Sequence, residues 1–146
     1  MSEPEWKIVL IDDEPGIRKV TSITLEDWGY VVDTAENGKA GIELCNRILP
    51  QMVITDVKMP GMDGLETLTE IKKGHPLKEV IMLTGHATIE TAIDGMKLGA
   101  FDYLMKPCDM DVLMAKVEEA AAKKQKHKDK IEKARIEEIM STRSIS

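Results

Sequence analysis

The chain has 146 residues, enough for one domain with its own core, and no apolar run approaches the roughly 20 residues of a membrane-spanning helix. The acidic N-terminus has no signal-peptide core, and Cys45 and Cys108 stand far apart without a CxxC motif. We therefore expect a cytoplasmic protein with reduced cysteines and no membrane partner. Residues 1–120 hold 12 Lys and Arg against 22 Asp and Glu, whereas residues 121–146 hold 8 against 4. An acidic body argues against nucleic-acid binding by residues 1–120 and leaves the basic end open.

Short apolar runs alternate along the chain with segments of helical pattern. The strands predicted from the apolar runs cover residues 6–11, 30–32, 52–54, 80–83 and 101–104. The helices predicted after them begin near residues 15, 37, 65, 87 and 109. Strict alternation with continuously apolar strands predicts an α/β fold, a doubly wound five-stranded parallel sheet covered on both faces.

Proline and glycine mark several of the predicted boundaries. Pro15 suits the first turn of a helix, and Gly29 and Gly99 are placed to end helices. Gly61 and Gly64 allow the loop after the third strand to turn sharply. In the fourth helix, the spacing of four apolar residues predicts an amphipathic face made of Ile89, Ala92, Ile93 and Met96.

Residues capable of chemistry stand at the ends of four strands. They are Asp12 with Asp13, Asp56, Thr84 and Lys106. In doubly wound sheets, ligands bind outside the carboxyl ends of the strands. Each residue alone has an ordinary explanation: a helix cap, a turn aspartate, a strand-end threonine or a solvated lysine. Together they favour a ligand-binding site at the carboxyl end of the sheet.

The motifs at these strand ends resemble the receiver domain of bacterial two-component response regulators. They are Asp12-Asp13-Glu14, Asp56 to Gly64, Thr84-Gly85-His86-Ala87 and Phe101 to Pro107. The resemblance covers residues 5–122, and the residues around Asp56 and Thr84 are most similar to receivers of the nitrogen-regulator class. It implies the flavodoxin-like strand order 2-1-3-4-5, in which the first and third strands are neighbours.

The resemblance also implies a role for each residue at the strand ends. Asp56 is the phosphoacceptor, which takes a phosphoryl group from the phosphohistidine of a sensor histidine kinase or a phosphotransfer protein. Asp13, Asp56 and the backbone carbonyl of Lys58 bind Mg²⁺, and Asp12 acts largely through water. Lys106 and the hydroxyl of Thr84 bind the phosphoryl oxygens.

A conformational switch and a tuning pair are further implications of the resemblance. Thr84 moves toward the phosphoryl group, Tyr103 swings into the vacated space, and the last two helices change shape together. Lys58 and His86 tune the rate at which water removes the phosphoryl group, although His86 alone is equally explained as a polar loop residue. Pro107 is a candidate for a cis peptide bond.

The last helix is predicted to continue well beyond a minimal receiver. No Gly or Pro occurs from Asp109 to Met140, and helix-forming residues dominate. Residues 123–146 therefore form a charged helical extension or linker. Lys124 and His127 interrupt its apolar seam, so a solvated helix and a dimerising coiled coil both remain open. The chain is either a stand-alone receiver or a receiver and linker from a longer protein.

Three other functions compete with a phosphorylated signalling switch. The first is an unphosphorylated scaffold with the same fold, against which the complete set of acidic, Thr and Lys positions argues. The second is a DNA-binding transcriptional regulator, although the basic end lacks aromatics and a recognition-helix pattern. The third is a flavin-binding protein, for which the acidic turn at residues 12–14 would repel phosphate.

Overall fold

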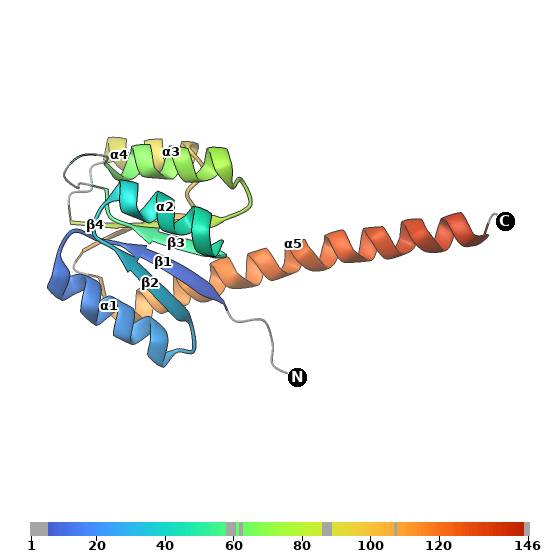
Figure 1. Ribbon diagram of the computed structural model, residues 1–146, viewed down its shortest axis with the longest axis horizontal. Coiled ribbons are helices and arrows are strands. Elements are labelled where there is room, and N and C mark those ends of the chain that lie inside the picture. Colours follow the sequence, from blue (N-terminus) through green and yellow to red (C-terminus); the bar gives the residue numbers. More distant parts are fainter. Residues whose placement is uncertain (1–5, 58–60, 62, 86–88, 107, 145–146) are drawn as a thin grey trace.

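A five-stranded parallel sheet forms the centre of the molecule (Figure 1). The computed structural model describes residues 6–57, 61, 63–85, 89–106 and 108–144. The strands are β1 (Lys7–Ile11), β2 (Val31–Ala35), β3 (Met52–Thr55), β4 (Glu79–Thr84) and β5 (Asp102–Met105). Their order is β2-β1-β3-β4-β5, which confirms the predicted flavodoxin-like topology. The helices are α1 (Pro15–Asp27), α2 (Gly38–Ile48), α3 (Gly64–Gly74), α4 (Ile89–Lys97) and α5 (Met110–Ser144).

The two faces of the sheet carry separate apolar clusters, because side chains alternate along each strand. On one face, Val9, Val53 and Val80 pack with buried residues of α2 and α3. On the other face, Leu10 and Ile54 pack against α1 and the first turns of α5. Figure 1 shows α2, α3 and α4 on one side of the sheet and α1 and α5 on the other. The doubly wound arrangement expected from the continuous apolar strands is thereby confirmed.

The helix boundaries follow from local chemistry. Pro15 opens α1, and Gly29 follows its end with φ 97°, in the left-handed region that favours glycine. The side chains of Asn37 and Asp63 cap α2 and α3 by accepting hydrogen bonds from backbone N–H groups in the first turn. Gly99, with φ 101°, follows α4 as expected.

Helix α4 packs on a different face from the one that its apolar spacing predicts. Ile93 and Met96 are about half exposed, whereas Gly95 is buried beside the ring of Tyr103. The helix lies against β5 at the edge of the sheet, where a small residue permits close approach. The apolar pattern identified the helix correctly, but it did not identify the buried face.

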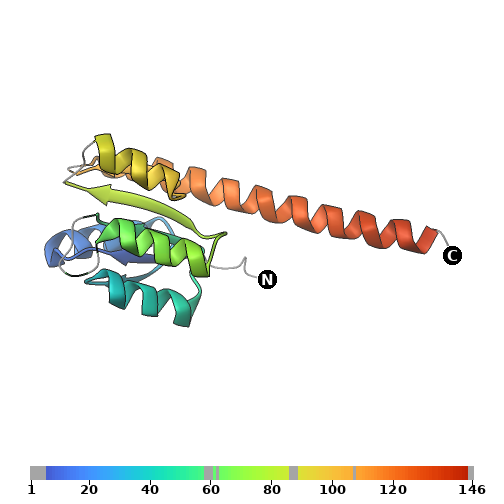
Figure 2. The same cartoon turned by 90° about the horizontal axis from the view of Figure 1, so that it is seen from above.

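Helix α5 extends far beyond the body of the protein (Figure 2). Its buried residues are Leu113, Met114, Val117 and Ala120, and nearly every later residue is exposed. The expected continuous C-terminal helix is confirmed. No helix within the described ranges is long and apolar enough to cross a membrane.

Candidate functional site

Asp12 and Asp56 lie side by side at the carboxyl end of the sheet. Strands β1 and β3 pair in parallel with Ile11 opposite Thr55, so each aspartate comes one residue after a paired position. The pairing continues into the loops, since the N–H of Asp56 donates to the carbonyl of Ile11 at 3.0 Å. Both side chains are buried, with 3% and 4% of Asp12 and Asp56 exposed. The topology thus brings together two carboxylates separated by 44 residues.

Four carboxylates converge at this point. Oxygens of Asp12, Asp13, Glu14 and Asp56 all lie within 4.8 Å of one another. The N–H of Glu14 donates to Asp12 Oδ1 at 2.9 Å and closes a tight turn between β1 and α1. Glu14 received no role in the sequence analysis, although its place directly after Asp13 was the available signal. The turn folds this third acidic side chain back onto the cluster.

Lys106 joins the two buried aspartates. Its ammonium donates to Asp12 Oδ2 at 2.6 Å and to Asp56 Oδ2 at 3.2 Å. Burial by itself lowers the pKa of Lys106, but the hydrogen bond and charge of Asp12, together with the charge of Asp56, outweigh burial and raise the pKa above its ordinary value. Lys106 therefore stays protonated at neutral pH and offsets part of the negative charge. One ammonium facing four carboxylates leaves the pocket strongly acidic.

The donor set of the pocket fits a hard divalent cation such as Mg²⁺. Carboxylate oxygens are the preferred ligands, and Mg²⁺ takes one or two of them at about 2.1 Å while keeping several waters. Two ligands of one Mg²⁺ lie at most about 4.2 Å apart. A spread of up to 4.8 Å therefore suits direct binding by some of the four groups and water-mediated binding by the rest. Asp13 and Glu14 lie at the solvent side of the cluster, where an ion would enter.

The first residues of α3 lie against the backbone that directly follows Asp56. The N–H of Val57 donates to Asp56 Oδ1 at 2.7 Å, and the N–H of Gly64 donates to the carbonyl of Val57 at 2.6 Å. A Cβ on Gly64 would lie only 2.5 Å from the Cα of Val57 and would overlap the carbonyl oxygen of Asp56. Glycine at this position therefore allows the start of α3 to pack directly against the backbone of Asp56 and Val57.

Thr84 and Tyr103 occupy neighbouring strands beside the pocket. Thr84 is fully buried at the end of β4, and its carbonyl accepts the N–H of Lys106 at 2.8 Å. Tyr103 is half-buried on β5, and its hydroxyl lies 3.0 Å from the hydroxyl of Thr91 on α4. Tyr103 thus joins the strand that carries Lys106 to helix α4.

Three of the residues singled out from the sequence lie outside the described residues. They are Lys58, His86 and Pro107. The carbonyl ligand, the tuning pair and the cis bond assigned to them remain predictions.

A groove between α1 and the start of α5 opens beside the acidic pocket. Its volume is about 720 Å³, and it runs from Ile17 and Val20 on α1 past Leu83 to Lys106. Ile17, Val20 and Ile23 are exposed on the same helix, at 36%, 60% and 50%. This surface was not predicted from the sequence, because apolar helical spacing is normally a sign of burial.

The fold and the pocket together define a doubly wound α/β protein with an acidic site, suited to a divalent cation, at the carboxyl end of its sheet. The response regulator receiver domain family matches residues 8–118, and the chain belongs to this family. The expected resemblance is thereby confirmed.

Individual relatives support the same assignment. The chain is 38% identical over 120 residues to the transcriptional regulatory protein GlrR of Escherichia coli. This alignment covers 82% of the chain and 27% of GlrR. The chain is also 40% identical over 111 residues to the DNA-binding transcriptional regulator NtrC of Escherichia coli. This alignment covers 76% of the chain and 24% of NtrC. The expected likeness to the nitrogen-regulator class is confirmed. The chain spans about a quarter of the length of these relatives.

Solved structures agree with the fold of this chain. A receiver domain protein from Methanospirillum hungatei matches with a TM-score of 0.83 at 30% identity, covering 85% of this chain and 99% of that one. A receiver domain protein from Clostridium thermocellum matches with a TM-score of 0.79 at 39% identity, covering 82% of this chain and 97% of that one.

Proposed function

We propose that the chain is a phosphorylation-controlled switch in which Asp56 accepts a phosphoryl group from a phosphohistidine. The observation that carries the proposal is the buried Asp56 carboxylate, held by Lys106 and the Val57 N–H inside an acidic pocket. The donor is a sensor histidine kinase or a phosphotransfer protein. The domain is regulatory and catalyses only its own phosphorylation and slow self-dephosphorylation. We place it in the cytoplasm, where free thiols such as Cys45 and Cys108 stay reduced.

The chemistry proposed for Asp56 is an in-line phosphoryl transfer. A carboxylate oxygen of Asp56 forms a bond to phosphorus as the phosphorus–nitrogen bond of the phosphohistidine breaks. The electron pair of the broken bond leaves with the imidazole, and the product is an acyl phosphate. Negative charge spreads over the three transferred oxygens, so catalysis consists mainly of positioning and cationic stabilisation. Lys106 supplies a fixed positive charge, and the Thr84 hydroxyl donates to a phosphoryl oxygen.

Mg²⁺ is the proposed cofactor of this transfer. Asp13 and Asp56 would hold it directly with the Lys58 carbonyl, Asp12 would act through water, and Glu14 extends the acidic rim. When bound, the ion neutralises the carboxylates and the incoming phosphoryl oxygens.

The groove beside α1 is the proposed docking surface for the phosphodonor. A donor histidine must reach Asp56, and the groove leads to Lys106 on the edge of the pocket. The exposed side chains of Ile17, Val20 and Ile23 provide an apolar surface that a partner would bury.

Phosphorylation is proposed to act on α4 and α5 through Thr84 and Tyr103. A phosphoryl group adds charge and acceptor oxygens at Asp56, toward which Thr84 moves. The inward swing of Tyr103 would change its contact with Thr91 and shift α4. Lys58 and His86 are proposed to tune dephosphorylation.

Residues 5–122 are proposed as the receiver domain and residues 123–146 as a linker. The last buried residue of α5 is Ala120, which supports this boundary. The exposed side chains of Ile131, Ile136 and Ile139 are proposed to pair two copies through α5, although charged residues of both signs flank them. A homodimer is therefore a proposed partner of the switch.

The relatives suggest a second candidate, the receiver part of a DNA-binding transcriptional regulator. NtrC carries that description, and the chain spans only 24% of it. In this candidate function the phosphoacceptor chemistry is the same, and a DNA-binding part of the protein would lie outside residues 1–146. An unphosphorylated scaffold remains the alternative that a failed phosphorylation would favour.

The test is phosphorylation by a small donor, followed by intact mass. The protein is incubated with acetyl phosphate with and without Mg²⁺, beside Asp56→Asn. We expect a Mg²⁺-dependent gain of one phosphoryl group that Asp56→Asn abolishes. Asp63→Asn is the matched control, since asparagine also caps a helix and α3 should be preserved. Absence of the gain from folded protein, with a phosphohistidine donor also failing, would refute the proposal.

A further inference from the structure

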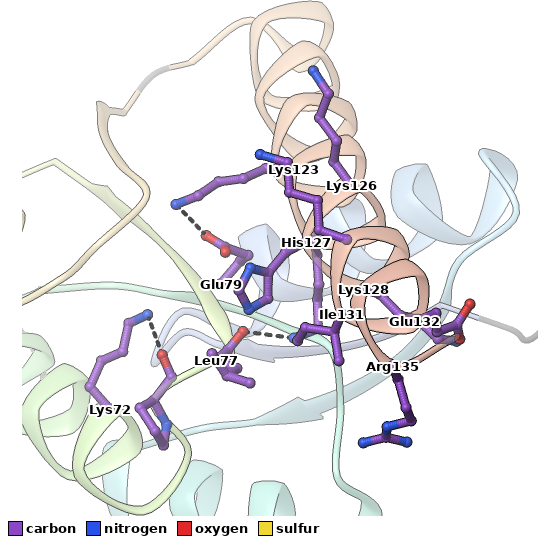
Figure 3. A pocket seen from close by; sticks show the side chains of 13 residues that line it. Lys72, Leu77, Glu79, Lys123, Lys126, His127, Lys128, Ile131, Glu132 and Arg135 are labelled. Carbon is purple, nitrogen blue, oxygen red and sulfur yellow. Dashed lines mark hydrogen bonds and ion pairs between the residues drawn. The ribbon is translucent and has the colours of Figure 1, made fainter. Parts of the chain in front are cut away.

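A second groove lies at the end of the sheet opposite the acidic pocket (Figure 3). It is formed where α5 leaves the body and passes the segment between α3 and β4. Its volume is about 710 Å³, within the range of small-molecule sites. We call it the basic groove. Its cations are Lys72 from α3 and, from α5, Lys123, Lys124, Lys126, Lys128, Lys130 and Arg135.

The charge of the basic groove opposes that of the whole chain. Seven Lys and Arg side chains line it, joined by His127, whereas its carboxylates are Glu79 and Glu132. The chain as a whole has a net charge of −6. The groove is therefore a local concentration of positive charge on an acidic protein. A groove lined by one sign of charge focuses the field and attracts counter-ions.

The inner cations are held in position by backbone carbonyls. Lys72 donates to the carbonyls of Pro76 and Lys78 at 3.2 and 2.7 Å, and Lys124 donates to the carbonyl of Leu77 at 2.6 Å. Burial lowers the pKa of Lys72, and the charges of Lys123 and Lys124 lower it further, against an opposing effect of Glu79. Like charges therefore repel one another across the floor of the groove, and a bound anion would relieve this repulsion.

The outer cations are available for a ligand. Within the described part of the chain, the side chains of Lys126, Lys128, Lys130 and Arg135 form no hydrogen bond or ion pair. Glu79 lies 3.8 Å from Lys123, which is a loose pair. The two carboxylates of the groove thus leave most of its positive charge uncompensated.

We propose that the basic groove binds a multiply phosphorylated small anion. Six of its seven Lys and Arg side chains are lysines, whose ammonium groups bind phosphate as point charges. Leu77 and Ile131, which are 60% and 43% exposed, add an apolar wall that an organic part of the ligand would cover. An acidic protein segment is the less favoured occupant, since the volume of the groove is that of a small-molecule site. This site is separate from Asp56 and independent of the proposed phosphotransfer.

Calorimetric titration with two probes in Mg²⁺-free buffer tests the proposal. Tripolyphosphate supplies the charge alone, and ATP supplies it with an organic part. Without a metal the acidic pocket repels both, so binding reports on other sites. We expect both probes to bind, with affinity that falls as salt rises. Tighter binding of ATP would assign Leu77 and Ile131 to the organic part, and equal binding would assign the site to inorganic polyphosphate.

Two triple variants localise the binding. Lys128→Gln/Lys130→Gln/Arg135→Gln removes three outer cations and should weaken binding about tenfold, while glutamine keeps α5 helical. Lys39→Gln/Lys97→Gln/Lys133→Gln makes the same change in net charge outside the groove lining and should bind like the unmodified chain. Absence of binding, or equal weakening in both variants, would overturn the proposal. Binding of duplex DNA without binding of either small anion would also overturn it, in favour of a nucleic-acid surface.

Discussion

Lys106 couples the electrostatics of the acidic pocket to the stability of the fold. Asp12 and Asp56 are both buried and close together, so their two negative charges repel each other. The Lys106 ammonium bridges them from the end of β5, the strand that also carries Tyr103. The same side chain is therefore a counter-ion of the two aspartates in this structure and the proposed ligand of the phosphoryl group after phosphorylation.

Replacing Lys106 should destabilise the metal-free protein. Lys106→Met leaves the buried aspartates without their ammonium, and we expect a loss of about 3 kcal/mol in the free energy of unfolding near neutral pH. Because the folded protein raises the pKa of Lys106, the contribution is fully present below the unfolded value of about 10.4 and is lost as pH rises through the higher folded value. The difference between the two proteins should stay constant from about pH 6 to 9 and shrink above about pH 10.

Urea denaturation across this pH range measures the effect of Lys106→Met. Lys116→Met is the control, because Lys116 pairs with Asp102 at 3.0 Å on the surface and should matter much less. Addition of Mg²⁺ should restore part of the stability of Lys106→Met, since the ion replaces the missing positive charge. Equal stability of both variants would show that Lys106 does not hold the pocket together.

Gly64 offers a second test at the scale of one residue. A Cβ at this position overlaps the backbone of Asp56 and Val57, which cannot move aside as a flexible side chain would. Gly64→Ala should cost about 1–3 kcal/mol of stability and slow phosphorylation by acetyl phosphate. Gly74→Ala is the control at the other end of α3, where a Cβ meets nothing within 4 Å. A Gly64→Ala protein with unchanged stability and phosphorylation rate would show that close packing of Gly64 on Asp56 and Val57 is not required.

At the scale of the elements, the sequence predicted all five strands and all five helices. Continuous apolar runs such as residues 52–54 predict buried parallel strands, and the polar residues after them predict the site, because parallel strands end at one edge of the sheet. The pairing of Lys106 with Asp12 could not be predicted, because the two residues are 94 positions apart in the sequence and their contact depends on the rotamer of each side chain. The exposure of Ile93 and Met96 could not be predicted either, because periodicity identifies an apolar face without identifying its partner.

Helix α4 is held to the sheet by Gly95 and by the hydroxyl pair of Thr91 and Tyr103. Among the residues of α4 whose burial the structure describes, only Gly95 is buried, which suits an element that changes position. Few buried apolar contacts give a low free energy for local displacement.

Tyr103→Phe tests whether the hydroxyl of Tyr103 couples α4 to the acidic pocket. The variant removes the hydroxyl next to Thr91 and should change stability by about 1 kcal/mol or less. We expect smaller changes in the amide NMR shifts of α4 when acetyl phosphate and Mg²⁺ are added, because the strand no longer has its hydrogen bond to the helix. Tyr30→Phe, on the opposite face of the sheet, is the control. Identical shift changes in Tyr103→Phe and the unmodified chain would exclude this hydrogen bond from the coupling.

At the scale of the whole molecule, charge and shape divide the chain at the same place. The acidic body holds every buried residue of the described ranges, while the part of α5 after residue 122 is basic and almost wholly exposed. Figures 1 and 2 show this part standing away from the body. It touches the body through the loose Lys123–Glu79 pair, the stacking of Lys123 over Phe101 and the hydrogen bond from Lys124 to Leu77.

Removing residues 123–146 should therefore leave the body folded. The interactions of Lys123 and Lys124 with the body lie at its surface, so we expect the free energy of unfolding of residues 1–122 to lie within about 1 kcal/mol of that of the full chain. Phosphorylation by acetyl phosphate should proceed at the same rate, because the pocket lies at the other end of the sheet. Urea denaturation and intact mass measure the two quantities. A large drop in stability would place the domain boundary beyond residue 122.

Sedimentation of the same two chains separates the solvated helix from the dimerising one. Lys124 and His127 interrupt the seam, and repulsion between basic helices opposes pairing. We expect the unphosphorylated full chain to be a monomer at micromolar concentration. If phosphorylation produces a dimer through the extension, the chain of residues 1–122 should not form that dimer. Raising salt should strengthen such a dimer by screening the repulsion, whereas salt should weaken anion binding in the basic groove. A dimer that persists in residues 1–122 would show that the body forms the dimer interface. The proposed role of the extension would then be limited to lining the basic groove.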